Sequence, residues 1–173
     1  MKEIYDFFYP RGKFILIFIG CLVLFCLTGN ALASDKENDT LPRFVSLRVS
    51  SANLRTGPGE RFPIEWIYQK KGLPIELLKK YDTWRKVRDY EGTEGWVHSR
   101  MLTDKRTVIT LNSDQSILYA DEDPTSDILA FIEPMVIGRL LECPQDSLFC
   151  KVAFTGATGW ILRKNLYGVY PFE

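Results

Sequence analysis

The chain has 173 residues, of which 46% are apolar and 25% are charged, and its 22 basic and 22 acidic side chains give a formal net charge of zero. This composition argues against a disordered chain, a collagen-like repeat and a multi-span membrane protein. Zero net charge supplies no overall field that would attract nucleic acid or anionic lipid. One histidine and four cysteines also leave few groups for metal binding or nucleophilic catalysis.

The N-terminal segment has the layout of a secretory signal peptide. Two basic residues precede an apolar run over residues 14–27, and small residues follow it. The run is shorter than the roughly 20 residues that a membrane-spanning helix needs. We therefore expect residues 1–33 to be a signal peptide cleaved between Ala33 and Ser34, with a retained signal anchor as the alternative. We expect the mature protein to be exported to the periplasm, with the cell exterior as the alternative.

Two cysteines follow the expected cleavage site, Cys143 and Cys150. Exported proteins fold in an oxidising compartment, so we expect a disulfide between them. A zinc site would need three or four neighbouring ligands, and His98, the one histidine of the chain, lies far upstream. We expect no metal and no cofactor.

An internal repeat with an offset of about 64 residues organises the rest of the chain. Gly95-Trp96-Val97 corresponds to Gly159-Trp160-Ile161, and Trp84-Arg85-Lys86-Val87 corresponds to Phe149-Cys150-Lys151-Val152. The order of the matches is kept throughout. The repeat predicts a short polar segment at 34–42 and two units of one fold, over residues 43–106 and 107–173.

Each unit is predicted to consist of short β-strands. In the first unit, four strand-like segments are separated by turn formers such as Lys71-Gly72 and Glu91-Gly92; the segments are residues 65–68, 75–78, 84–88 and 95–98. Beyond residue 33, no window of eleven or more residues has a convincing helical period. We therefore predict an all-β protein of two small barrels, whose closure would remove exposed strand edges.

The spacing and the charges of the units indicate that the two barrels pack closely. Only about five residues separate Leu102 from Val108, too few for a flexible tether. Residues 43–106 carry 14 basic and eight acidic side chains, net +6, whereas residues 107–173 carry four and nine, net −5. Opposite fields would favour association; the alternative is two solvated faces that merely differ.

Three motifs of the first unit carry a resemblance to a known family: Asn53-Leu54-Arg55-Thr56-Gly57-Pro58-Gly59, Trp84-Arg85-Lys86-Val87 and Glu94-Gly95-Trp96-Val97-His98. They are similar to the signature of bacterial SH3-like (SH3b) domains, above all the tandem copies in secreted proteins of alphaproteobacterial type. The resemblance covers residues 43–104 well and 107–171 more weakly. It implies SH3-like barrels in an exported protein with a binding role, and peptidoglycan or its peptide stems as the ligand.

Seven residues of the first unit are the candidate ligand-binding residues: Asn53, Arg55, Gly57, Pro58, Trp66, Tyr81 and Trp84. The two glycines around Pro58 are free to take positive φ, which suits a tight loop after the strand. If Leu54 enters the core, Arg55 points outward and is available to a carboxylate or a partner carbonyl, with a structural salt bridge as the alternative.

The spacing of Trp84 and Val87 prevents both side chains from lying on one face of a regular strand. We expect Trp84 to lie partly exposed beside Tyr81, where the pair could stack on a flat ligand; the alternative is a second core anchor. Structural roles are assigned to Gly95, Trp96, Gly159 and Trp160. Gly95 would allow close backbone approach, and Trp96 would lie in the barrel core.

The second unit departs from the motif. Residues 119–124 replace the arginine and the Gly-Pro-Gly loop, so binding should be concentrated in the first unit. The acidic residues at 121–127 lack the alternating ligands and central glycine of a calcium loop, and we expect a solvated acidic loop there.

No catalytic pattern is found in the sequence. His98 and the two remaining cysteines lie in different units, and the mature chain has no GxSxG, SxxK or phosphate-loop motif. We expect a non-catalytic exported protein that recognises peptidoglycan or its peptide stems through the first unit. The alternative is a protein–protein interaction adaptor, whose protein partner contacts the basic face of that unit. Nucleic acid is disfavoured by export, and the membrane would be contacted only through an uncleaved signal peptide.

Overall fold

The computed structural model describes residues 40–111 and 113–171. The expected signal peptide and its cleavage site between Ala33 and Ser34 lie outside the described residues. Nowhere in the described part of the chain is there a helix of sufficient length and apolarity to cross a membrane.

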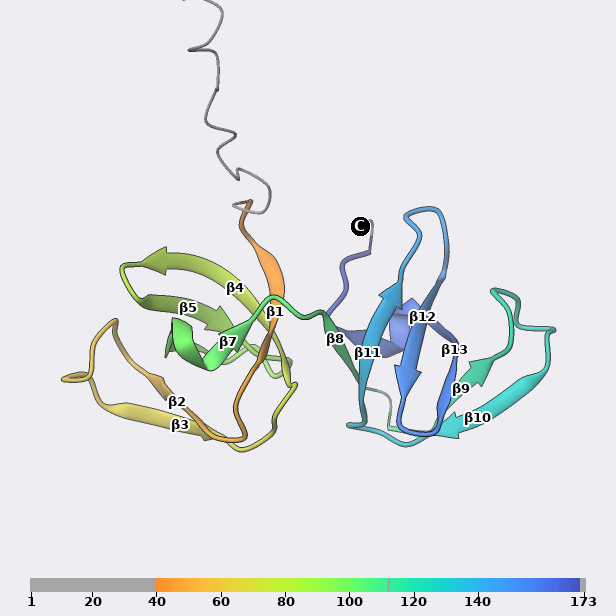
Figure 1. Cartoon of the computed structure of the whole chain (residues 1–173), viewed down its shortest axis with the longest axis horizontal. Helices are drawn as coiled ribbons and strands as arrows, with labels where there is room; N and C mark the ends of the chain where they lie inside the picture. The colour runs from red at the N-terminus through yellow and green to blue at the C-terminus, as the bar shows by residue number, and fades with distance from the viewer. Residues whose placement is uncertain (1–39, 112, 172–173) are drawn as a thin grey trace, which may run out of the picture. The chain divides into compact units, whose positions relative to one another are not determined.

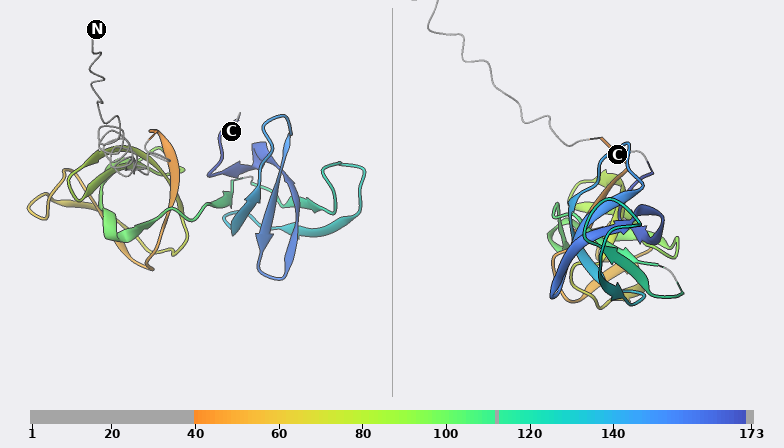
Figure 2. Two further views of the ribbon diagram at one scale, coloured as in Figure 1. Left: turned by 45° about the horizontal axis from the view of Figure 1, so that its top comes forward. Right: turned by 90° about the vertical axis from the view of Figure 1, so that its right-hand side faces the viewer.

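The first seven strands form one antiparallel sheet, barrel 1 (Figure 1). They are β1 (Arg43–Leu47), β2 (Ala52–Arg55), β3 (Ile64–Tyr68), β4 (Pro74–Tyr81), β5 (Trp84–Arg88), β6 (Glu94–His98) and β7 (Leu102–Thr103), with a 3₁₀ turn, η1 (Ser99–Met101), before β7. Their order in the sheet is β3-β2-β6-β5-β4-β1-β7. The strands curve round a common centre in the left view of Figure 2.

The next seven strands form a second antiparallel sheet, barrel 2. They are β8 (Thr107–Thr110), β9 (Ser116–Tyr119), β10 (Ile128–Ile132), β11 (Ile137–Glu142), β12 (Phe149–Phe154), β13 (Ala157–Leu162) and β14 (Leu166–Tyr167), with η2 (Arg163–Asn165) before β14. Their order is β10-β9-β13-β12-β11-β8-β14, which reproduces barrel 1 strand by strand. The prediction of an all-β protein of two SH3-like barrels is confirmed.

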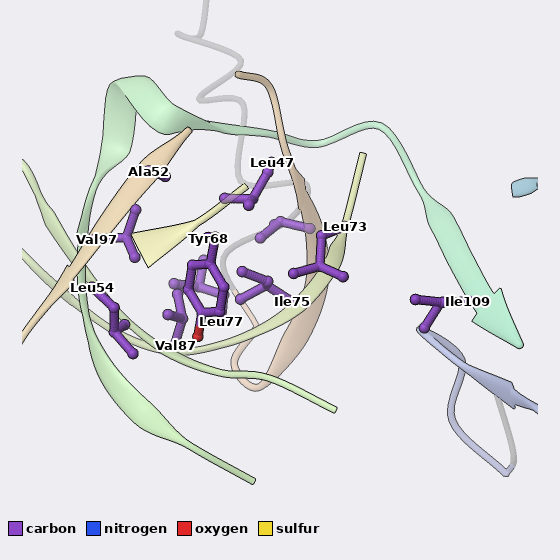
Figure 3. Packing of buried hydrophobic residues seen from close by; sticks show 11 residues of the cluster. Leu47, Ala52, Leu54, Tyr68, Leu73, Ile75, Leu77, Val87, Val97 and Ile109 are labelled. Carbon is purple, nitrogen blue, oxygen red and sulfur yellow. The ribbon is translucent and has the colours of Figure 1, made fainter. Parts of the chain in front are cut away.

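Alternation along the strands fills each barrel with apolar side chains. Leu54, Ile75, Val87 and Val97 have no exposed surface in barrel 1, and Figure 3 shows them turned toward a shared interior. Leu118, Val152 and Ile161 hold the places of Leu54, Val87 and Val97 in barrel 2, where the buried Cys150 joins them in the core. Both turn-forming glycines named above take positive φ, 79° at Gly72 and 87° at Gly92.

The glycine predictions at the strand crossings are confirmed. A Cβ on Gly95 would lie 2.6 Å from Leu54 Cγ and 3.0 Å from the carbonyl oxygen of Arg55, and one on Gly159 would collide with the carbonyl oxygen of Tyr119. Only glycine therefore lets β2 and β9 approach β6 and β13 this closely.

The placement of Trp96 in the core is wrong. Trp96 and Trp160 are half-buried and lie outside the two core clusters, because Val97 and Ile161 take the inward positions. Neighbouring residues of a strand point to opposite faces, so both tryptophans lie on the outer faces of their sheets. There Trp160 stacks with the Lys151 ammonium, 5.6 Å from the ring centroid.

Closure does not remove every strand edge, contrary to the prediction. Among the described strands, β3 pairs with β2 alone, and β10 pairs with β9 alone. Both terminal strands expose apolar side chains, among them Ile64, Trp66 and Ile67 on β3 and Ile128, Leu129 and Phe131 on β10. The outer sides of β3 and β10 are thus edges that can accept a further strand.

Aromatic rings make much of the contact between the two barrels. The Phe44 ring is 6% exposed, although it points away from the core of barrel 1. It packs edge-on against Tyr167, with centroids 5.1 Å apart, and against Tyr170 at 4.6 Å. Ring packing therefore holds the two barrels together, a contact that their opposite net charges did not indicate.

Tyrosine hydroxyls complete this contact. The Tyr167 hydroxyl donates to the carbonyl oxygen of Arg88 at 2.8 Å, and the Tyr170 hydroxyl donates to Glu76 Oε1 at 3.0 Å. Burial, together with the nearby Glu76 carboxylate, raises the pKa of Tyr167 well above its usual range, so its hydroxyl stays a donor. The three-residue linker 104–106 is also held, since Ser46 Oγ donates to the carbonyl oxygen of Lys105 at 2.7 Å.

Replacing Phe44 by alanine should lower the free energy of unfolding by about 3 kcal/mol, because the change removes a buried ring from the contact between the barrels. Phe131→Ala is the matched control, since Phe131 is 58% exposed. Guanidinium unfolding measures both variants. Equal effects would mean that the barrels do not stabilise each other through Phe44.

The expected disulfide is present and closes a short loop in barrel 2. It joins Cys143, just after β11, to Cys150 on β12, with Cα atoms 4.2 Å apart. Cys150 is fully buried, so the bond fixes the loop directly to the barrel core.

Reduction of this disulfide should lower the free energy of unfolding by about 2–3 kcal/mol, because a closed loop restricts the unfolded chain. Thermal melts with and without a reductant test this. A Cys143→Ala, Cys150→Ala double variant corrects for other effects of the reductant. An unchanged melting temperature in the native sequence would show that the loop adds nothing to stability.

Candidate functional site

The outer face of β5 and β6 gathers polar and aromatic side chains of barrel 1. Val87 and Val97 point inward, so their strand neighbours of opposite parity point outward. Trp84 is paired with His98, and Lys86 is paired with Trp96. Arg55 of β2 lies opposite Trp96 on the other side of β6. Three strands thus present one continuous outer surface.

A pocket of about 370 Å³ opens at one end of this surface. The start of β2, the following loop, β5, β6 and η1 all contribute to it, through Ser51, Ala52, Asn53, Arg55, Glu60, Trp84, His98, Arg100 and Met101. We call it the barrel 1 pocket. Two guanidinium groups, one carboxylate, one amide, one imidazole and one indole share it, a set suited to a polar ligand with a flat or apolar part.

Arg55 braces the pocket from its own loop. Its Nη1 donates to the carbonyl oxygens of Glu60 at 3.0 Å and Phe62 at 2.7 Å. Arg55 lies on the outer side of the strand, as expected. The carbonyl oxygens that it contacts belong to the loop after β2 rather than to a binding partner. Arg55 therefore fixes the loop between β2 and β3, and what it offers a ligand is the rest of its guanidinium group.

Gly57 is required for packing rather than for a left-handed backbone. Neither Gly57 nor Gly59 has a positive φ, so the loop does not use this freedom of the two glycines. A Cβ on Gly57 would collide with the Phe62 ring. The ring thus lies directly on the backbone of the loop that also contains Pro58, and neither Gly57 nor Pro58 lines the barrel 1 pocket.

Trp84 is more buried than the sequence argument expected. Its side chain is 9% exposed, and its ring packs edge-on against His98 with centroids 5.3 Å apart. Trp84 lines the pocket and is not part of the core cluster. It is therefore neither the partly exposed partner of Tyr81 nor the core anchor that the sequence left as alternatives.

Tyr81 and Trp66 lie outside the barrel 1 pocket. Tyr81 is 59% exposed and packs against Trp96, with centroids 6.4 Å apart, instead of Trp84. Trp66 lies on β3 and lines a separate hollow with Tyr90 and Glu91. Of the seven candidate residues, the structure brings Asn53, Arg55 and Trp84 together.

Sequence reasoning did not identify His98 and Arg100 as site residues. Strand alternation could have identified His98, because it follows inward Val97 and pairs with Trp84. Its Nδ1 accepts a hydrogen bond of 3.2 Å from the backbone N–H of Arg100. That bond ties the imidazole to η1, which carries the exposed Arg100 side chain to the pocket rim.

Ion pairs order the neighbouring part of the outer face. Lys86 Nζ lies 2.6 Å from Glu94 Oε2, and Arg88 Nε lies 3.1 Å from Glu94 Oε1. Hydrogen bonds from these two cations lower the pKa of Glu94, which stays ionised. Glu94 therefore holds both cations away from the pocket.

Barrel 2 has a counterpart of the pocket with different chemistry. A hollow of about 370 Å³ is lined by Gln115, Ile117, Tyr119, Leu162, Lys164 and Asn165. By the repeat and the strand register, Tyr119 replaces Arg55 and Leu162 replaces His98. In addition, Ile117 replaces Asn53. At these three positions an amide, a guanidinium and an imidazole are lost, while Gln115 and Asn165 supply amides elsewhere in the second pocket.

Comparison with known families agrees with this fold. Residues 48–104, which include most of barrel 1, match the family described as the bacterial SH3 domain. This part of the chain is a bacterial SH3 domain.

One similar curated protein is "Putative N-acetylmuramoyl-L-alanine amidase YrvJ" of Bacillus subtilis (strain 168), with 30% identity over 125 residues. The aligned segment covers 66% of this chain and 24% of that protein, so the chain spans about a quarter of the relative's length.

Two solved structures from Trichomonas vaginalis are also similar. NlpC2 has 13% identity and NlpC1 has 14%, each with a TM-score of 0.34. The matches cover 73% and 77% of this chain and 48% of each solved chain.

Proposed function

We propose that this protein is a non-catalytic, exported binding protein that holds peptidoglycan peptide stems in the barrel 1 pocket. The observation that carries the proposal is the convergence of Asn53, Arg55, Arg100, Trp84 and His98 in one pocket of a bacterial SH3 domain. A stem peptide offers carboxylates to the guanidinium groups and amides to the Asn53 side chain.

Two further observations support a cell-envelope role. The curated relative is named as a putative N-acetylmuramoyl-L-alanine amidase, and the similarity covers 66% of this chain. The Cys143–Cys150 disulfide fits an oxidising compartment. Export and a binding role without catalysis are part of this proposal.

A second candidate function, a protein–protein adaptor, is favoured by the edge of barrel 1. β3 exposes Ile64, Trp66 and Ile67 along a strand that has one free side. A partner could add a strand there by backbone hydrogen bonding, with its side chains on these apolar groups. That site lies on different residues from the barrel 1 pocket, so variants can separate the two functions.

The charge of Arg100 provides the test. Arg100→Glu places a carboxylate at the pocket rim, and it should weaken binding to purified, protein-free sacculi at least tenfold, since a like charge would face the stem carboxylates. Co-sedimentation at physiological salt measures the dissociation constant. Circular dichroism checks that the variant is folded.

Arg139→Glu is the matched control, because Arg139 is exposed on barrel 2 and the charge change is the same. Equal loss in both variants would show general attraction to an anionic polymer and would contradict the pocket. Loss on Trp66→Ala, with Arg100→Glu unchanged, would move binding to the β3 edge.

A further inference from the structure

A separate pocket lies at the C-terminal part of barrel 2, where the disulfide-closed loop meets η2 and the segment 169–171. Its volume is about 480 Å³. Most of its walls are apolar and are formed by Leu148, Leu162, Leu166, Val169, Tyr170 and Pro171. We call it the barrel 2 pocket. It is larger and more apolar in its lining than the barrel 1 pocket.

A buried cation lies in the wall of this pocket. Arg163 is 8% exposed. Its Nη1 donates to the carbonyl oxygens of Tyr170 at 2.9 Å and Pro171 at 3.0 Å, and its Nη2 donates to the carbonyl oxygen of Pro144. Its Nε is buried and has no hydrogen-bond partner among the described residues. Arg163 therefore places a fixed, largely buried positive charge in the wall of the pocket, and a negative charge on a ligand would be favoured nearby.

The disulfide holds the loop that forms one wall of the pocket. Cys143 and Cys150 bracket residues 144–149. Within the loop, Ser147 N–H donates to the carbonyl oxygen of Pro144 at 3.1 Å, and Arg163 N–H donates to the carbonyl oxygen of Leu148 at 2.7 Å. Leu148 borders the pocket, and its side chain is 76% exposed to solvent. The wall is thus built with an apolar side chain left uncovered at its rim.

We propose that the barrel 2 pocket binds a small apolar carboxylate of the fatty-acid class. Its carboxylate is attracted by the exposed Lys164 and by the buried guanidinium charge of Arg163, and its chain lies against Leu148, Leu166 and Val169. The negative charge of the ligand suits the two cations in the lining, and its hydrocarbon chain suits the apolar walls.

A free acyl carboxylate fits the pocket better than a peptide does. Each peptide group would bring an N–H and a carbonyl oxygen that need partners once they leave water. The lining offers few neutral polar groups, chiefly Ser147, whose Oγ already accepts from Phe149 N–H at 2.9 Å. A hydrocarbon chain needs no such partners.

Decanoate titrated into the ¹⁵N-labelled full chain tests the proposal. NMR should show saturable shifts of the amide signals of Ser147, Leu148 and Val169. Acetate, which lacks the chain, and decanol, which lacks the charge, should each bind at least tenfold more weakly. Absence of saturable shifts at these residues, or equal binding of decanol, would overturn the proposal.

Two exposed positions give variants that keep the buried Arg163 intact. Leu148→Ser removes an apolar contact and should weaken decanoate binding about tenfold, the order expected for one lost leucine contact. Lys164→Gln should weaken decanoate binding and leave decanol binding unchanged. Leu129→Ser, at a 49% exposed leucine of β10, is the control. If Leu129→Ser weakens binding as much as Leu148→Ser, decanoate binds as a nonspecific amphiphile and the proposal fails.

Discussion

The inward direction of Val87 and Val97 is the constraint on which the outer surface of barrel 1 depends. Both valines are fully buried and sit on neighbouring strands. Because a strand alternates its side chains, this direction sends Trp84, Trp96 and His98 outward together. Gly95 extends the effect to β2, since its missing side chain lets Leu54 and Arg55 cross closely. Core packing therefore decides which groups can line the barrel 1 pocket.

The two barrels show how one frame can carry different chemistry. Strand order, the 3₁₀ turn and the close glycine crossing are repeated in both. In barrel 2, however, the place of Arg55 is taken by Tyr119 and that of His98 by Leu162. Barrel 2 also has a disulfide-closed loop and a C-terminal segment, and these enclose a more apolar pocket. Barrel 2 also contributes Tyr167 and Tyr170 to the contact with barrel 1.

Local patterns predicted the fold well, and the failures involve contacts between segments. The repeat, the strand positions, the turn at Gly72 and the disulfide follow from periodicity, turn chemistry and spacing. Trp96 lies outside the core, contrary to the prediction, because Val97 points inward and strand alternation turns its neighbour to the outer face. The contact of Gly57 with Phe62 and the bonds of Arg55 to loop carbonyl oxygens depend on how the loop folds back. No local signal in the sequence indicates such contacts.

The proposed function assigns the stem peptide of peptidoglycan to the barrel 1 pocket and to no site on barrel 2. The most direct measurement is an NMR titration of the protein with a soluble muropeptide that carries an intact stem. The account predicts saturable amide shifts concentrated at Asn53, His98 and Arg100, with the signals of Gln115 and Lys164 unchanged. Shifts confined to β3, equal shifts in both barrels, or no shifts at saturating muropeptide would contradict it.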